Sequence, residues 1–233
     1  MIVRGLRRTL AVAAVFGLMS AVTSMAHAAT MIEYEGTVTS GTAGSFGPTS
    51  TAPSGLTVGD FTITMSATPI APGSLTSNAI AVNNAGSTTE TIKLEVSGTG
   101  FTPGVGIIAY GNSASGTATT TSSPAQTATL QGYTDQGNTL FALTNTPGPQ
   151  AATASGFPAT FNFGSSSILN SSFTTSGAFS ITQVFMITLP AGANANLTLS
   201  TSSSAVPEPS TSLMLLTGLP LLGYYGLRRR AKA

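Results

Sequence analysis

The sequence predicts an all-β protein, an antiparallel β-sandwich or jelly roll, flanked by an apolar segment at each end. Short runs rich in β-branched and aromatic residues alternate with polar residues at every second position. Connections containing Gly and Pro separate these runs. Between the two apolar segments, hardly any stretch suggests a helix longer than two turns, so the crossover helices of a parallel α/β fold are missing.

The clearest predicted strands alternate apolar and polar residues strictly, which places the apolar side chains on one face of a sheet. This alternation occurs at Phe61–Ser66, Ile92–Ser97 and Ala195–Ser200, and the longer apolar run 178–189 predicts a central strand. Further strands are expected at 32–39, 105–110, 125–131, 139–144 and 159–163, and turns at 41–55, 69–73, 83–86, 134–138 and 146–156. A right-handed β-solenoid is the second possibility, although a fixed repeat period is lacking.

The first 28 residues have the three zones of a secretory signal peptide. A basic region precedes the apolar core at Leu10–Met19, and Ala26-His27-Ala28 is an A-x-A cleavage site. We therefore expect the mature chain to begin at Ala29, with an uncleaved anchor as the alternative. The basic residues are Arg4, Arg7 and Arg8.

A second apolar segment, Leu213–Leu227, is followed by Arg228, Arg229, Arg230 and Lys232. Comfortable membrane spanning takes about 20 apolar residues, so this span is marginal, and the basic residues after it favour the cytoplasmic side. Upstream, the prolines of Val206-Pro207-Glu208-Pro209 disfavour helix and predict an extended, accessible tag. Together these features are typical of a processing signal, and an ordinary membrane anchor is the alternative.

This arrangement closely resembles the PEP-CTERM sorting domain, which consists of a V-P-E-P motif, a Leu-rich helix and an Arg-rich cap. The resemblance covers about the last 28 residues of the 233. It implies recognition by a membrane-embedded exosortase, removal of the tail, and delivery to the surface or exopolysaccharide matrix of a Gram-negative bacterium. The domain layout is then a signal peptide at 1–28, a β-sandwich body at 29–200, a flexible spacer at 201–205 and a sorting signal at 206–233.

The exported body is acidic, although the whole chain has a formal charge of +1. Seven of the eight basic residues lie in the two end segments, so residues 29–206 contain Lys93 alone against six acids and have a net charge of −5. Nucleic-acid binding requires clustered Lys or Arg to displace counterions. We therefore expect no nucleic-acid partner for this body.

The chain contains no Cys or Trp, and its one histidine is His27 in the predicted signal peptide. A mature chain without His and Cys cannot build a Ser-His-Asp or Cys-His nucleophile, nor a His- or Cys-ligated metal site. The segment Gly104–Ala109 matches a dinucleotide fingerprint only in its letters, since the residues after it do not predict a helix. We expect no cofactor and a body that is not an enzyme.

Two carboxylates, Glu33 and Glu35, are the strongest candidate site residues in the body. They are two positions apart on a predicted strand and should share one face. They could bind Ca²⁺ through oxygen ligands, or act with Asp60 in a glycan hydrolase or lyase. Alternatively, they protect an exposed edge strand from aggregation. Lys93 and Glu95 are expected to form an exposed ion pair of small energetic value.

Aromatic residues supply one further hypothesis. Tyr34, Tyr110 and Tyr133 could stack on sugar rings, which would make the body a polysaccharide-binding module of the matrix. The alternative is that they belong to the core or rim of the sandwich. The leading hypothesis remains a non-enzymatic surface protein that an exosortase processes at its C-terminal tag.

Overall fold

The computed structural model describes residues 31–70, 73–102, 106–119, 125–146, 148–154, 159–161 and 171–206. The predicted signal peptide and the sorting segment after Val206 lie outside these residues. Within the described ranges, every regular element is a β-strand, and no helix has the length and apolar character needed to cross a membrane. The predicted all-β class is confirmed.

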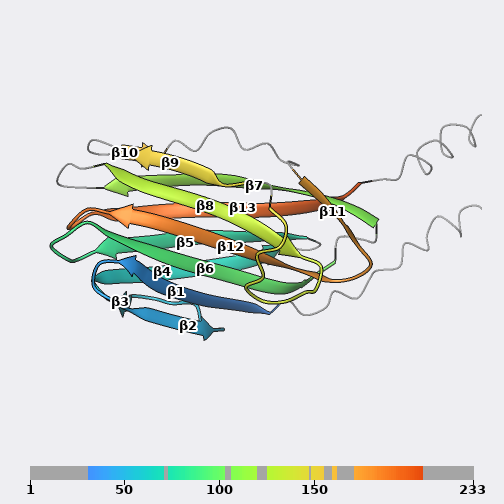
Figure 1. The fold of residues 1–233 in the computed structure, drawn as a ribbon, viewed down its shortest axis with the longest axis horizontal. Coiled ribbons are helices and arrows are strands. Elements are labelled where there is room, and N and C mark those ends of the chain that lie inside the picture. Colours follow the sequence, from blue (N-terminus) through green and yellow to red (C-terminus); the bar gives the residue numbers. More distant parts are fainter. Residues whose placement is uncertain are drawn as a thin grey trace, which may run out of the picture.

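The strands form two antiparallel sheets (Figure 1). The six-stranded sheet has the order β2-β1-β6-β12-β8-β9, comprising Ser45–Thr49, Ile32–Ser40, Glu90–Phe101, Phe179–Leu189, Gln126–Asp135 and Gln150–Ala154. The seven-stranded sheet has the order β10-β7-β13-β5-β4-β3, with β11 also paired to β7, comprising Ala159–Phe161, Gly106–Thr119, Asn194–Ala205, Ser74–Asn84, Phe61–Ile70, Leu56–Val58 and, for β11, Ser171–Thr175.

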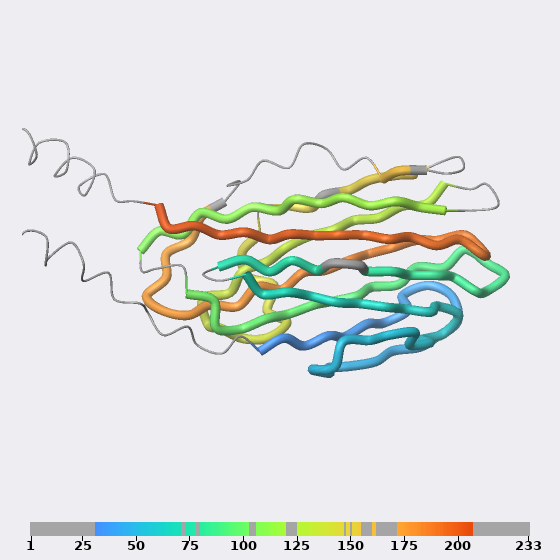
Figure 2. The backbone as a smooth tube through the Cα atoms, turned by 180° about the vertical axis from the view of Figure 1, so that it is seen from behind, coloured from blue at the N-terminus to red at the C-terminus, as the bar shows by residue number. Residues whose placement is uncertain are grey.

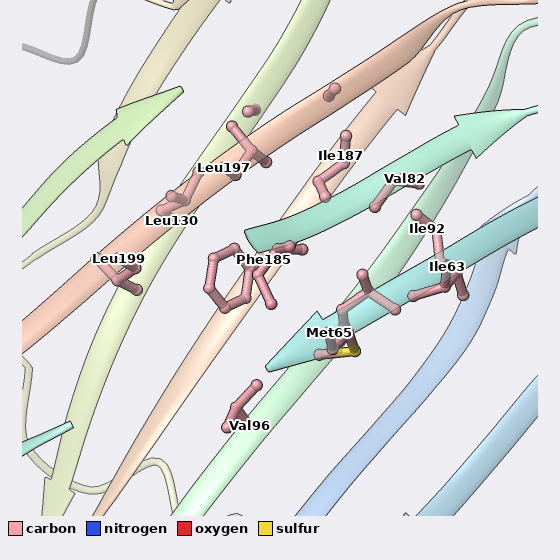
Figure 3. Packing of buried hydrophobic residues seen from close by; sticks show 14 of the residues in the cluster. Ile63, Met65, Val82, Ile92, Val96, Leu130, Phe185, Ile187, Leu197 and Leu199 are labelled. Atoms are coloured by element: carbon pink, nitrogen blue, oxygen red, sulfur yellow. The ribbon is translucent and has the colours of Figure 1, made fainter. Parts of the chain in front are cut away.

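One hydrophobic core lies between the two sheets (Figure 3). The predicted alternations supply it directly, since Phe61 and Ile63 of β4 and Ile92 and Leu94 of β6 are fully buried. Each fully buried Leu, Ile or Phe contributes about 1.5–3 kcal/mol relative to an exposed one. The expected strand at 178–189 is β12, which lies between β6 and β8 as a central strand should.

An aromatic cluster joins the two sheets at one end of the sandwich. Phe101 of β6 lies 6.0 Å from Phe179 of β12, measured between ring centroids. Phe179 lies 5.2 Å from Phe173 of β11, and Phe173 lies 5.6 Å from Tyr110 of β7. The last two contacts are edge-to-face, which is the favoured geometry for aromatic pairs.

The prediction of a strand at 139–144 is wrong, because these residues belong to the connection between β8 and β9. Phe141 within this range has a φ of 58°, and Asn138 just before it has a φ of 55°, values that a strand does not allow. Several strands were not expected, namely β2, β3, β5, β9 and β11. Most of these are three to five residues long, so partners remote in sequence, rather than local alternation, specify them.

The expected spacer at 201–205 is also wrong, because it forms the last part of β13. Thr201 is fully buried, and Ala205 pairs with Ile108 of β7. The Ser and Thr residues that suggest a flexible linker instead lie in a strand with neighbours on both sides for most of its length. The folded body therefore reaches the start of the sorting tag.

Candidate functional site

The sorting tag begins where the folded body ends. The amide of Val206 donates a 2.8 Å hydrogen bond to the carbonyl of Ile107, which fixes the first residue of the motif against β7. Pro207, Glu208, Pro209 and the basic cap Arg228, Arg229 and Arg230 lie outside the described residues. The predicted signal cleavage site at Ala26 and Ala28 lies outside them as well.

A second candidate region is the outer face of the six-stranded sheet, meaning the solvent-side residues of β1, β6, β12 and β8. Glu33 and Glu35 both lie on this face, as expected, because the intervening Tyr34 is buried against the core. The register places Glu35 directly opposite Glu95 of β6. The sequence alone did not indicate this neighbour, because the register between β1 and β6 is not visible in either strand.

Glu35 and Glu95 form a hydrogen-bonded pair of carboxyl groups. Burial raises the pKa of Glu35, and the hydrogen bond and negative charge of Glu95 raise it further, to about 7. The positive charge of Lys93 lowers this pKa, while Glu33 adds to the increase. A negative charge beside a carboxyl group favours its protonated, neutral form, which is the direction of the shift at Glu35.

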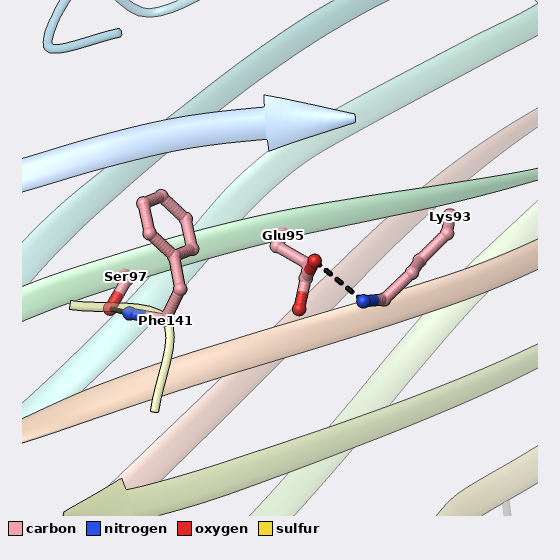
Figure 4. A network of polar contacts seen from close by, with 4 residues as sticks. All are labelled: Lys93, Glu95, Ser97 and Phe141. Carbon is pink, nitrogen blue, oxygen red and sulfur yellow. Dashed lines mark hydrogen bonds and ion pairs between the residues drawn. The ribbon is translucent and has the colours of Figure 1, made fainter. Parts of the chain in front are cut away.

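Lys93 lies beside the pair and forms an ion pair with Glu95 (Figure 4). Its Nζ is 2.6 Å from Oε2 of Glu95, and the two side chains are 33% and 8% exposed. The predicted ion pair between Lys93 and Glu95 therefore forms, but it is partly buried rather than exposed. A partly desolvated pair is more costly to break than a surface pair, because the remaining charge is left without compensation.

The β8–β9 connection covers one part of the outer face. The Phe141 amide donates a 2.9 Å hydrogen bond to the Ser97 hydroxyl of β6, and Ser180 of β12 donates to the Thr139 carbonyl at 2.6 Å. Asn138 accepts from the Gly100 amide at 2.8 Å. These contacts explain why Ser97 and Ser180 are fully buried although they lie on the solvent side of the sheet.

The three tyrosines are not equivalent. Tyr34 and Tyr110 are 4% and 0% exposed, so the hypothesis that they stack on sugar rings is wrong for both. Burial raises the pKa of Tyr34, and a hydrogen bond from the Ala67 amide to its hydroxyl lowers it in part. Tyr133 lies on the outer face near Lys93 and Glu95, and burial also raises its pKa. Only Tyr133 keeps a partly exposed ring.

The structure does not bring Asp60 to Glu33 and Glu35. Asp60 lies in the turn between β3 and β4, where its carbonyl accepts from the Ala85 amide at 2.9 Å. Glu33 and Glu35 lie on the other sheet, on its solvent side. Among the described residues, no cluster of three or more His, Cys, Asp and Glu side chains has an arrangement suited to a metal ion. Calcium binding by Glu33 and Glu35 stays a prediction.

A groove of about 660 Å³ lies at the open edge of the sandwich, beside the edge strands β2 and β3. Its size falls within the usual range for ligand pockets, about 300–1,000 Å³. None of the lining residues is charged. Phe46, Pro48 and Leu56 supply apolar surface, and Thr51, Ser54 and Thr57 supply hydroxyl groups. The sequence analysis missed this region, which it described only as a long turn.

The described part of the chain thus defines an all-β protein whose body runs without a spacer into its C-terminal segment. Residues 205–230 of that segment match the family model of the PEP-CTERM protein-sorting motif. The predicted resemblance is confirmed, and the chain carries this motif. No curated protein sequence matches the chain.

Several solved structures share a limited likeness with the body. TmCBM61, solved in complex with β-1,4-galactotriose, has 11% identity and a TM-score of 0.24, covering 63% of this chain and 88% of that chain. TmCBM27, described as a mannan-recognising carbohydrate-binding module, has 12% identity and a TM-score of 0.29, covering 62% and 80%. A structure of infectious bursal disease virus, Gx strain, has 10% identity and a TM-score of 0.24, covering 78% and 53%. TM-scores this low assign no ligand to this chain.

Proposed function

We propose that this chain is the precursor of a bacterial surface or extracellular-matrix protein, which an exosortase processes at its C-terminal tag. The match of residues 205–230 to the PEP-CTERM sorting motif carries this proposal. The signal-peptide pattern at residues 1–28 supports export, and the basic residues outside both apolar segments support a body on the external side of the membrane.

The body acts without catalysis in this proposal. Glycosidase carboxyl pairs are about 5–5.5 Å or 6.5–9.5 Å apart, because the sugar or a water must fit between them. Glu35 and Glu95 instead bond to each other directly, and Glu95 also pairs with Lys93. This arrangement favours a structural role for the carboxyl groups.

Intact mass spectrometry tests the sorting proposal. We expect the protein recovered from the cell surface or culture fluid to lack residues 1–28 and the segment after the V-P-E-P motif. In a strain without the exosortase, the tail should remain and the protein should stay in the membrane fraction. An intact tail on the mature protein of the parent strain would instead support an ordinary anchor.

A second candidate function is binding of a matrix polysaccharide by the groove at the edge of the sandwich. The uncharged lining of Phe46, Leu56 and exposed hydroxyl groups favours it, because sugars combine apolar ring faces with hydroxyl groups. A peptide strand fits less well, because Pro48 and the positive φ of Gly47, 106°, interrupt the edge strand to which a peptide would add.

A triple variant, Thr51→Val, Ser54→Ala and Thr57→Val, tests this second candidate by pull-down on purified matrix polysaccharide. These side chains are exposed, so the fold should tolerate the changes. We expect at least a tenfold loss of binding, whereas Ser87→Ala and Thr89→Val in the exposed β5–β6 turn should leave binding unchanged. Equal binding by all variants, or no binding by the parent protein, would remove this candidate.

A further inference from the structure

Four exposed apolar side chains gather at one end of the sandwich. The described residues include six large hydrophobic side chains with substantial exposure, and Met31, Ile70, Ile107 and Val206 are 49%, 51%, 47% and 41% exposed. The other two are Leu143 in the β8–β9 connection and Met186 in the middle of β12. Exposed apolar residues are common singly, so their grouping is the informative observation.

The strand register shows that these four residues share one end, which we call the tethered end. Val206 contacts Ile107 at the start of β7, as described above. Ile70 ends β4 and pairs with Ser74, which begins β5 and also pairs with Ser202 of β13. Met31 precedes β1, and its carbonyl accepts a 3.0 Å hydrogen bond from Thr99 near the end of β6.

Both end segments of the chain leave the body from the tethered end. In Figure 1 and Figure 2, the blue start of β1 and the red end of β13 lie at the same end of the sandwich. The aromatic cluster formed by Phe101, Phe179, Phe173 and Tyr110 joins the two sheets beneath this end. The turns 85–89 and 190–193 lie at the opposite end, since β5 and β12 run toward it.

The length of the C-terminal connection limits how far the tethered end can stand from a membrane. Only residues 207–212 separate Val206 from the apolar run that begins at Leu213. A fully extended chain spans at most about 3.6 Å per residue, so the seven steps from Val206 to Leu213 cover no more than roughly 25 Å. The headgroup region itself occupies about 5–8 Å of that distance on each side of the bilayer.

We infer that the tethered end is a membrane-contact surface, and that the precursor rests on the lipid headgroup region through Ile70, Ile107 and their apolar neighbours. The inference depends on the proposed sorting function, since it requires the C-terminal segment in the bilayer. The contact is apolar rather than electrostatic. Lys93, the one basic residue of the body, lies near the start of β6, toward the opposite end of the sandwich, while Glu33 and Asp135 are the acids nearest the tethered end in the strand order.

This surface has a consequence for processing. With the tethered end on the headgroups, the V-P-E-P motif that follows Val206 is held at the membrane surface, within reach of a membrane-embedded enzyme. The opposite end of the sandwich then points away from the bilayer. The long axis of the β-sandwich therefore stands away from the membrane surface until the tag is removed.

Depth-dependent fluorescence quenching tests the orientation, and the absence of cysteine from the chain makes single labels straightforward. The full-length chain with Ser204→Cys at the tethered end, or Ser87→Cys at the opposite end, is labelled and reconstituted into phosphatidylcholine vesicles without exosortase. Both serines are exposed, so the two substitutions are matched. A nitroxide on the lipid headgroup should quench the label at Ser204 at least threefold more than the label at Ser87.

The contribution of the apolar contact is measured in the same assay with Ile70→Ser and Ile107→Ser combined. We expect quenching at Ser204 to fall at least twofold, whereas Met186→Ser, an exposed apolar position in mid-sheet, should leave it unchanged. Adding anionic lipid should not strengthen the contact, because no basic cluster attracts it. Equal quenching at both labels, or no effect of the double variant, would overturn the inference.

Flotation of the vesicles separates this inference from the proposed function. If the labelled chain fails to float with the vesicles, the C-terminal segment is not in the bilayer, and the proposed sorting function fails with the inference. If the chain floats but the label at Ser204 is not preferentially quenched, only the membrane-contact surface is wrong.

Discussion

Gln183 of the six-stranded sheet donates a 3.1 Å hydrogen bond to the hydroxyl of Thr201 in the seven-stranded sheet, inside the core. The same amide donates to the carbonyls of Leu75 and Leu199 at 2.8 and 3.0 Å, and its oxygen accepts from Ser77. Thr201 in turn donates to Asn112 of β7 at 3.0 Å. Gln183 thus ties two strands of the opposite sheet, β5 and β13, to β12, and Thr201 extends the network to β7. A shift of one sheet against the other would break several hydrogen bonds at once.

Gln183→Leu should destabilise the body by about 2–4 kcal/mol, because the buried Ser77 hydroxyl and the carbonyls of Leu75 and Leu199 would lose their bonds to Gln183, and Thr201 would keep only its bond to Asn112. Urea unfolding followed by circular dichroism measures the loss. Gln131→Leu, on the outer face of β8, removes an amide whose one side-chain hydrogen bond within the described residues is to Thr146 at 2.9 Å, and it should cost much less. Equal losses of unfolding free energy in the two variants would show that the hydrogen bonds of Gln183 in the core stabilise the body no more than the surface bond of Gln131.

Gly132 has no side chain, and the hydrogen-bonded side chains of Asn112 and Thr201 fill the space where its Cβ would lie. A Cβ at this position would lie 2.2 Å from both Oδ1 of Asn112 and Oγ1 of Thr201. Gly132→Ala should therefore cost about 1–3 kcal/mol, as expected for overpacking. Gly177→Ala is the matched control, since a Cβ there meets no atom within 4 Å. Similar unfolding midpoints for the two variants would contradict the packing described for Gly132.

The Glu35–Glu95 pair predicts a dependence of stability on pH. Because the pKa of Glu35 is raised from 4.5 to about 7, the folded state holds a proton in this range that the unfolded state has lost. The stabilisation is fully present below 4.5 and is lost as the pH rises toward about 7. Since the Glu35 side chain is only partly buried, solvent screening limits the change in unfolding free energy between these pH values to about 1 kcal/mol.

Glu35→Gln should remove this dependence. The variant should be more stable than the parent protein at about pH 8, and the advantage should vanish at about pH 4, where Glu35 is neutral in both states. Urea unfolding at both pH values measures the difference. Glu33→Gln removes the same charge outside the hydrogen-bonded pair and should retain most of the slope. A parallel loss of slope in both variants would refute the assignment to the pair.

Tyr110→Phe should leave the stability unchanged or raise it by up to about 1 kcal/mol. The Tyr110 hydroxyl is buried and has no hydrogen-bond partner among the described residues, so its removal deletes an uncompensated polar group. Tyr34→Phe is the comparison, because the Tyr34 hydroxyl accepts from the Ala67 amide at 3.2 Å, and this variant should be destabilised. Thermal unfolding distinguishes them, and a large loss for Tyr110→Phe would indicate a hidden partner.

Much of the fold was predictable because it depends on local pattern. The alternation around Phe61, Ile92 and Leu197 identified buried faces correctly, since a pleated strand turns every second side chain to the same side. The strands that escaped prediction, such as β2 and β9, are short and at sheet edges, where partners rather than propensity determine the conformation. The Ser-rich end of β13 is likewise a strand because of its partners, since it pairs with β7 and β5 although its residues suggest a flexible linker.

The sequence by itself determined the all-β class, the acidic body without His or Cys, and the sorting motif, because each depends on composition or on residues close together in the chain. Only the tertiary structure decided which residues meet. It paired Glu35 with Glu95, buried Tyr110, and brought Ile70, Ile107 and Val206 to one end. These contacts depend on the register between strands distant in sequence, and one residue of slip would turn every side chain to the other face.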